Sequence, residues 1–151
     1  MRLAIGDTGP YARPASGDGG RQFNPKETLM RITVTLPASD LDRAKAWYAQ
    51  VLGVEPVESR PTGELWYELG DSRFLLYSSQ FAGTNQATAA GIQVDDFDAT
   101  VAQLRERGAV LEDYDFGEDF RTTDGIITMP DGNRSAWMKD SEGNILAITS
   151  M

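Results

Sequence analysis

The stretch Lys139-Asp140-Ser141-Glu142-Gly143-Asn144-Ile145-Leu146-Ala147-Ile148 lies near the end of the 151-residue chain. Its Ser-Glu-Gly-Asn segment is typical of a tight turn, and the residues that follow predict a short final strand, Ile145–Ser150. A similar turn, Pro130-Asp131-Gly132-Asn133, precedes a strand predicted at Arg134–Lys139 and follows another at Ile126–Met129. The chain is therefore predicted to end in three strands joined by two glycine-containing hairpin turns.

The order strand-helix-strand-strand-strand is predicted twice, which indicates an internal duplication. Asp95-Asp96-Phe97-Asp98 repeats Ser39-Asp40-Leu41-Asp42 at an offset of 56 residues, with Ser39 and Asp95 as the expected helix N-caps. Gly53 and Gly108 are expected to end the two helices. The remaining strands are predicted at Arg31–Leu36, Val54–Ser59, Glu64–Leu69, Arg73–Ser79, Ala87–Val94 and Val110–Tyr114, the last of these in addition to the three closing strands of the second module.

Composition divides the chain into two parts. Residues 1–29 are rich in glycine and proline and have no periodic apolar face, so they are predicted to form a flexible N-terminal extension. Residues 30–151 are predicted to form one domain with modules at about 30–80 and 86–151. This length is sufficient for a hydrophobic core without disulfides.

The absence of cysteine and histidine excludes several kinds of chemistry. Thiolate catalysis, disulfides and a Ser-His-Asp triad are impossible, and a metal would need carboxylate, carbonyl or water ligands. The net charge of -9 and a pI near 4.4 argue against nucleic acid and anionic membranes as partners. No apolar run has the length of a membrane span, and no signal peptide is evident, so a cytoplasmic protein is expected.

The duplicated modules and the closing Lys139–Asn144 turn, with the helix sequence around Trp47-Tyr48 and Leu52-Gly53, resemble the vicinal oxygen chelate superfamily. This superfamily contains glyoxalases, bleomycin-resistance proteins and extradiol dioxygenases. The resemblance covers about residues 30–151. It implies an α+β fold in which two tandem βαβββ modules form an eight-stranded cup, with helices outside and a pocket within. It also implies a homodimer.

The resemblance further implies four positions for metal ligands, at the first and last strand of each module. These positions correspond to Thr33, the region of Leu75, Ala89 and Ala147. Alanine and leucine have no ligand atoms, and a lone threonine hydroxyl is a poor ligand. We therefore expect no metal and no other cofactor, and the chelating chemistry of the family is not transferred to this chain.

Strand alternation predicts which side chains pack under the helices and which enter the cup. Those expected under the helices are Ile32, Val34, Ile92, Val94, Leu146 and Ile148. Those expected to bind a ligand in the cup are Thr33, Thr35, Trp66, Glu68, Leu75, Tyr77, Ala89, Gln93, Trp137, Ala147 and Thr149, with Gly91 beside them. The aromatic residues among them could instead fill a core.

Two residues are candidates for acid or base catalysis. Glu68, if it lay inside an apolar cup, could have a raised pKa, and Tyr77 could donate a proton. The alternative for Glu68 is a strand carboxylate that reaches water or pairs with an arginine. A structural role is the alternative for Tyr77.

Two loops are candidates for a role at the mouth of the cup. The acidic segment Glu112–Asp119 has the opening spacing of a calcium loop, but Glu118 stands where glycine is required, so it is interpreted as a solvated rim. The segment Gln80–Gln86, which joins the modules, could contact a ligand or serve as a plain linker.

Two functions from different classes follow from these features. The first is metal-independent binding of a small aromatic or amphipathic molecule, of which drug sequestration is one form. The second is a metal-free isomerase or lyase that uses Glu68 or Tyr77. A metal-dependent glyoxalase or dioxygenase ranks third, and whether the protein is an enzyme stays open.

Overall fold

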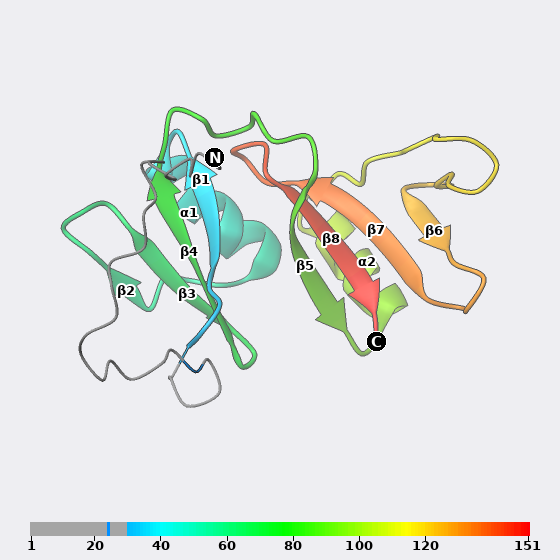
Figure 1. The fold of residues 1–151 in the computed structure, drawn as a ribbon, viewed down its shortest axis with the longest axis horizontal. Coiled ribbons are helices and arrows are strands. Elements are labelled where there is room, and N and C mark those ends of the chain that lie inside the picture. The colour runs from blue at the N-terminus through cyan, green and yellow to red at the C-terminus, as the bar shows by residue number, and fades with distance from the viewer. Residues whose placement is uncertain (1–23, 25–29) are drawn as a thin grey trace, which may run out of the picture. The chain divides into compact units, whose positions relative to one another are not determined.

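Two four-stranded sheets, each with a helix behind it, make up the domain (Figure 1). The computed structural model describes residue 24 and residues 30–151, and the unit discussed below spans Ile32–Met151. The flexible extension predicted for residues 1–29 lies outside the described residues except for Asn24. The elements are β1 (Val34–Ala38), α1 (Leu41–Trp47), the π-helical turn η1 (Tyr48–Leu52), β2 (Glu58–Ser59), β3 (Leu65–Leu69), β4 (Ser72–Ser78), β5 (Thr88–Val94), α2 (Phe97–Glu106), β6 (Ile126–Thr128), β7 (Arg134–Lys139) and β8 (Ile145–Ser150).

The two sheets have the same topology, which confirms the predicted duplication of βαβββ modules. Their strand orders are β1-β4-β3-β2 and β5-β8-β7-β6. In each module the first strand pairs in parallel with the last, and the last three strands form antiparallel hairpins. The parallel pairing is possible because a helical crossover separates the strands in sequence.

Side chains on the helix-facing side of both sheets form the hydrophobic core. Leu146 and Ile148 are buried there as predicted. From the helices, Tyr48 and Val51 pack from the first module and Val101 and Leu104 from the second. Because this face supplies the core, the opposite face of each sheet is left for other contacts. The buried strand residues of the core are Leu36, Ala38, Tyr67, Phe74, Leu76, Ala136, Met138, Leu146 and Ile148.

Both helix N-caps lie one residue later than predicted. Asp40 and Asp96 accept hydrogen bonds of 3.0 Å from the backbone N–H groups three residues on, so they cap α1 and α2 in place of Ser39 and Asp95. A carboxylate satisfies these otherwise unpaired donors and also interacts favourably with the helix N-terminus. The hydroxyl of Ser39 is used elsewhere, as described below.

Several predicted strand boundaries are wrong. The strand predicted at Val54–Ser59 is only the two-residue β2, and Val110–Tyr114 forms a single bridge between Leu111 and Met138. Ile32, expected under the helices, is 100 % exposed because it precedes β1. A register shift between Thr88 and Ala90 leaves Ala89 without a partner in β8, and Ala89, expected in the cup, packs against the core.

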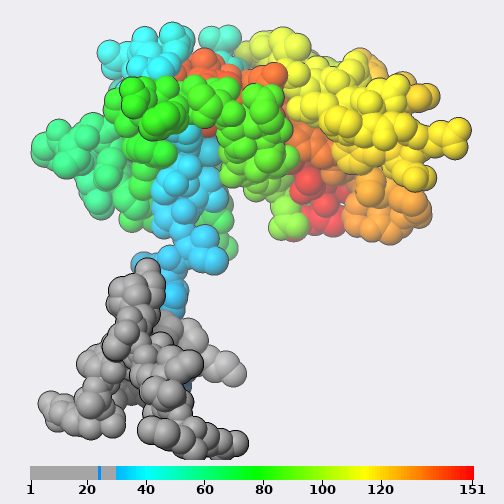
Figure 2. Space-filling model, turned by 45° about the horizontal axis from the view of Figure 1, so that its top comes forward, coloured from blue at the N-terminus to red at the C-terminus, as the bar shows by residue number. Residues whose placement is uncertain are grey.

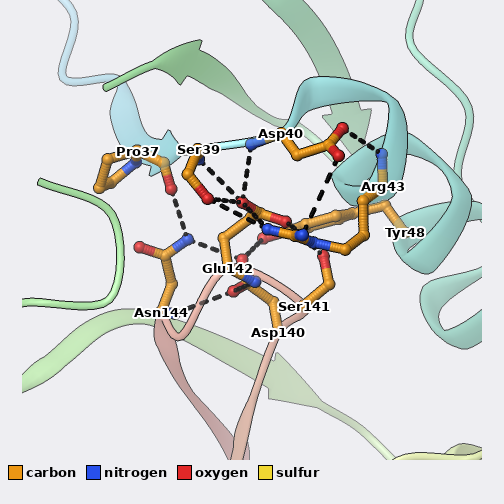
Figure 3. A network of polar contacts seen from close by, with 9 residues as sticks. All are labelled: Pro37, Ser39, Asp40, Arg43, Tyr48, Asp140, Ser141, Glu142 and Asn144. Carbon is orange, nitrogen blue, oxygen red and sulfur yellow. Dashed lines mark hydrogen bonds and ion pairs between the residues drawn. The ribbon is translucent and has the colours of Figure 1, made fainter. Parts of the chain in front are cut away.

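The carboxylate of Glu142 connects the two modules (Figure 3). Its Oε2 accepts hydrogen bonds from the backbone N–H groups of Ser39 and Asp40, at 2.8 and 3.0 Å, and from the Ser39 hydroxyl. Arg43 Nε donates to Oε1 at 2.8 Å, and its Nη2 donates to Oε2. The side chain of Glu142 is 0 % exposed. This last turn of the second module therefore holds the junction between β1 and α1 of the first.

Asp140 organises the turn that carries Glu142. Its carboxylate accepts hydrogen bonds from the backbone N–H groups of Glu142 and Asn144 and from the Asn144 side chain. The buried hydroxyl of Tyr48 donates to it at 2.9 Å, and Asn144 Nδ2 also donates to the Pro37 carbonyl. Burial first, and then the Asp140 carboxylate, raise the pKa of Tyr48, which keeps this hydroxyl a donor. The turn is thus tied to η1 and to β1.

We expect Glu142→Gln to lower the free energy of unfolding by about 3 kcal/mol, because buried donors lose a charged acceptor. Although burial disfavours the charged form of Glu142, hydrogen bonds from Arg43, Asp40, Ser39 and Ser141 lower its pKa from 4.5 to about 2. The folded protein therefore binds this proton less readily than the unfolded chain. Its contribution is complete above about pH 4.5 and is lost as the pH falls toward 2.

Urea unfolding of both proteins between pH 7 and pH 2.5 measures this contribution. The stability difference should shrink as the pH falls below 4.5. Glu106→Gln, an exposed residue of α2, is the control with the same charge change and should alter stability by less than about 0.5 kcal/mol. A difference between Glu142→Gln and the parent that stays constant over this range would contradict the assignment.

Gly143 in the same turn leaves no room for a side chain. Its φ is +84°, and an added Cβ would lie 2.8 Å from the Cα of Gly83 in the linker between the modules. Gly132, in the preceding hairpin turn, has a similar φ of +89°, but a Cβ added there would have no atom within 4 Å. A comparison of alanine substitutions at these two positions therefore distinguishes the cost of backbone strain from the cost of steric overlap.

We expect Gly132→Ala to cost about 1 kcal/mol through its left-handed backbone and Gly143→Ala to cost at least about 1 kcal/mol more through the clash. Thermal and urea unfolding of the two variants measure both costs. Equal destabilisation would show that the linker moves away from the turn without cost.

Candidate functional site

The four positions that correspond to metal ligands do not form a metal site. Leu75 in β4 and Ala147 in β8 are buried and have no ligand atoms, and Ala89 packs against the core. Thr33, just before β1, contributes a single hydroxyl. Within residues 30–151, no three Asp or Glu side chains are grouped closely enough to hold a metal ion. These residues do not fit the catalytic metal of the family.

On the exposed face of the first sheet, Trp66 is covered by two arginines. In the β3–β4 register it lies opposite Leu75. The guanidinium carbons of Arg60 and Arg73 lie 4.6 and 5.0 Å from the centre of its ring, and its indole N–H donates to Glu64 at 3.2 Å. The face of Trp66 is thus already occupied by side chains of the protein.

Glu68 does not lie in an apolar cup. Its side chain is 57 % exposed, and it forms an ion pair with Arg73 at 3.5 Å. Glu68 therefore fits the alternative to catalysis given above, a strand carboxylate that pairs with an arginine. The other predicted residues of the exposed faces, Thr33, Thr35, Tyr77, Gln93 and Thr149, are half-buried or exposed, and none lines a described cavity.

Trp137 lines a cavity of about 200 Å³ beside the exposed face of the second sheet. It is the one residue of the predicted ligand-binding set that does so. Its indole N–H donates to the Thr88 hydroxyl at 3.2 Å, which fixes the ring against β5. The lining residues are Gln86, Ala87, Thr88, Tyr114, Phe116, Phe120, Trp137 and Ile145.

Four rings of this lining, Tyr114, Phe116, Phe120 and Trp137, contact one another in a closed cycle that we call the aromatic box. The four ring-to-ring centroid distances around the cycle lie between 5.6 and 5.8 Å. Trp137 is at 86° to Tyr114 and at 55° to Phe120. The wall of the cavity therefore presents ring faces in more than one direction.

Three rings of the box belong to the loop 111–125, which lies beside β7 and β8 (yellow in Figure 2). Backbone hydrogen bonds attach the loop to β7, where Glu112 N donates to the Trp137 carbonyl at 2.8 Å. Within the loop, Asp113 Oδ1 accepts hydrogen bonds from Gly125 N at 2.7 Å and from the Thr122 hydroxyl at 2.9 Å. These two bonds lower the pKa of Asp113. The loop is therefore held from its first residues to its last.

Sequence patterns do not identify three of the four box residues. The carboxylates of the loop indicate a solvated rim, and no strand or helix period groups Tyr114, Phe116 and Phe120. Their spacing is the available signal, since three aromatic residues within seven positions are unusual in a purely solvated loop. Gln86, at the end of the linker and expected as a possible contact, does line the cavity.

A second cavity of about 130 Å³ lies at the seam between the modules. Apolar residues such as Val34, Leu36, Ile92 and Leu146 line it on the core side of the sheets. Arg73 is part of its lining, but the guanidinium of this residue lies over Trp66. Without converging polar groups, this cavity resembles a packing gap in the core more than a binding site.

A model of the glyoxalase/bleomycin resistance protein/dioxygenase superfamily matches residues 31–148. The chain belongs to this superfamily. A comparison with curated protein sequences found no match. Among the described residues, no helix is long and apolar enough to cross a membrane.

Solved structures of other superfamily members have the same fold. Lactoylglutathione lyase from Agrobacterium tumefaciens is 20 % identical, with a TM-score of 0.61 over 82 % of this chain and 95 % of that chain. A glyoxalase/bleomycin resistance protein from Catenulispora acidiphila is 23 % identical, with a TM-score of 0.59 over 81 % and 98 %. A bleomycin-binding protein in complex with bleomycin is 20 % identical, with a TM-score of 0.60 over 81 % and 98 %. These likenesses support the superfamily fold alone.

We expect Asp113→Ala to loosen the loop 111–125, since Gly125 N and the Thr122 hydroxyl lose their shared acceptor. Hydrogen exchange should become faster at the amides of Phe116–Arg121 and Gly125, whereas the amides of β7 and β8 should stay protected. Asp119→Ala, an exposed residue of the same loop, is the control and should leave the exchange pattern unchanged. Uniform acceleration throughout the second sheet would contradict a local role for Asp113.

Proposed function

We propose that this superfamily member binds a small, flat organic molecule in the cavity between Trp137 and the loop 111–125, without a metal. The aromatic box is the observation that carries the proposal. Ring faces attract flat apolar molecules by area burial and by stacking. A cavity of about 200 Å³ also exceeds the roughly 150 Å³ of an engineered apolar cavity that takes up benzene.

Polar groups at one side of the cavity would orient the ligand. Gln86 contributes an amide, and the Thr88 hydroxyl, which accepts from Trp137, keeps its own proton available to donate. Ile145 adds an aliphatic wall. An apolar cavity with a few polar groups is the usual composition of a small-molecule site.

Binding is favoured over catalysis because the cavity lacks a suitable acid or base. Glu68 and Tyr77 do not line it. Tyr114 is the ionisable side chain in the lining, and burial, followed by the Glu112 charge, raises its pKa. Tyr114 is therefore protonated at neutral pH and can donate a hydrogen bond but cannot serve as a base.

The proposed biological role is sequestration of such a molecule by a cytoplasmic homodimer. A solved bleomycin-binding protein in complex with bleomycin has the same fold, which supports the binding part of this role. Sedimentation velocity on the purified chain tests the oligomeric state independently of ligand binding.

N-phenyl-1-naphthylamine, a neutral probe whose fluorescence rises in apolar sites, should bind the protein in a saturable manner. Trp137→Leu should weaken this binding at least about tenfold, because it removes stacking and buried area. Trp66→Leu, which changes the same residue type in the first sheet, should leave the affinity unchanged. Glu68→Gln should also have no effect.

Dialysis against a chelator should not alter the affinity of the probe. Far-UV circular dichroism of each variant verifies that the fold is retained. A need for a metal ion, or equal weakening by Trp66→Leu and Trp137→Leu, would overturn the proposed site.

A further inference from the structure

The two modules place a tryptophan at the same point of their sheets. Trp66 in β3 lies opposite Leu75 in β4, and Trp137 in β7 lies opposite Ala147 in β8. The two pairs occupy corresponding positions in the last hairpin of each module. Internal duplication therefore allows a direct comparison of what covers each ring.

In the first module, the cations over the tryptophan ring are arginine side chains of the protein. Arg60 and Arg73 lie within 5.0 Å of the centre of the Trp66 ring. Carboxylates complete this arrangement, because Glu58 pairs with both arginines. The face of an indole ring has a negative potential that favours such cations.

In the second module the corresponding ring has aromatic neighbours but no cation. Within residues 30–151, the guanidinium groups that lie over aromatic rings are those of Arg60 and Arg73 over Trp66 and of Arg134 over Phe97. The aromatic box is therefore a cluster of ring faces beside an open cavity, and no side-chain cation of the described chain lies over it.

The charge around the box is strongly negative. The loop 111–125 contains six carboxylates and one arginine. The nearby cations are already paired, Arg121 with Asp115 at 3.0 Å and Lys139 with Glu112 at 3.6 Å. Among the described residues, Glu118 and Asp119, between Phe116 and Phe120, form no ion pair. Because these two residues lie next to the box in sequence, their charges can attract a cation in the cavity over the roughly 10 Å Debye length at ordinary salt.

We infer that the cavity selects organic cations, in particular a quaternary or tertiary ammonium group attached to an aromatic body. The ammonium group lies in the cavity against the rings of the aromatic box, where it supplies the cation that the two arginines supply to Trp66. Ring faces in several directions suit a methylated ammonium group, which has no single hydrogen-bond direction. This inference rests on the proposed binding function and specifies the chemical class of the ligand.

Two probes of the same shape and different charge test this selectivity. 3-Hydroxyphenyl-trimethylammonium and 3-tert-butylphenol differ only in having nitrogen or carbon at the branch point. Isothermal titration calorimetry should give at least about tenfold tighter binding of the cation, which corresponds to about 1.4 kcal/mol. The preference should fall as salt is raised from 0.05 to 0.5 M, because salt screens the carboxylates. The Debye length is roughly 10 Å near 0.1 M and shortens as the salt concentration rises.

Variants separate the rings from the carboxylates. Trp137→Leu and Phe116→Leu should each reduce the preference for the cation at least about threefold. Phe116 is 73 % exposed, so its replacement does not empty a core position. Glu118→Gln with Asp119→Asn should reduce the preference. Asp95→Asn with Glu106→Gln, which removes the same charge from exposed positions elsewhere, should leave it unchanged.

The outcomes distinguish the two levels of the proposal. If 3-tert-butylphenol binds as tightly as the cation, and Trp137→Leu weakens it, the cation selectivity is overturned and the binding site stands. If neither probe binds, the cation selectivity is overturned, and the titration with N-phenyl-1-naphthylamine decides whether the binding site stands. A preference for the cation that survives both Trp137→Leu and Phe116→Leu would place the cation elsewhere and would also overturn the inference.

Discussion

The arrangement of the domain depends on one buried carboxylate. Glu142 comes from the turn between β7 and β8 of the second module, and its partners from outside that turn lie where the first module passes from strand to helix, namely Ser39, Asp40 and Arg43. A charged acceptor without water must be fully satisfied, so its position fixes the positions of its donors. Arg43 remains 53 % exposed, which lets solvent share the cost of the pair. The two duplicated halves are thus joined by a polar contact in addition to the common core.

Local sequence signals predicted the order of elements because each signal has a local physical cause. Helix N-caps, glycines with positive φ and strand alternation act within a few residues, and they indicated the two βαβββ modules. Both caps and several strand ends are displaced, and the strand predicted at Val110–Tyr114 is reduced to a single bridge. Glu142 was recognised as part of a turn, but its role was not predicted, since its partners lie about a hundred residues earlier. The register shift between Thr88 and Ala90 also had no local signal, so alternation did not predict that Ala89 would pack against the core.

The candidate site was less predictable than the fold for the same reason. Alternation correctly placed Trp66 and Trp137 away from the core, but it could not show what would cover them. Two arginines cover Trp66, and one of them, Arg73, forms an ion pair with the exposed Glu68. Trp137 is covered by a loop whose aromatic residues follow no regular period, so no pattern of strands or helices could connect them to β7. The many charged residues of that loop led to its interpretation as a solvated rim, so its three aromatic residues were not predicted to line a cavity.

The contact between Gly83 and Gly143 bears on how two copies of the chain could associate. If two chains exchanged modules, the bonds of Glu142 and Asp140 to the first module could all form again between chains, because every partner would still be present. What would change is the path of residues 79–87. In the single chain this segment turns through local hydrogen bonds among residues 79–84 and passes directly against the final turn at Gly83. The segment 79–87 therefore decides whether the two modules of one chain pack together or are exchanged between two chains. The contacts between the modules are the same in both cases.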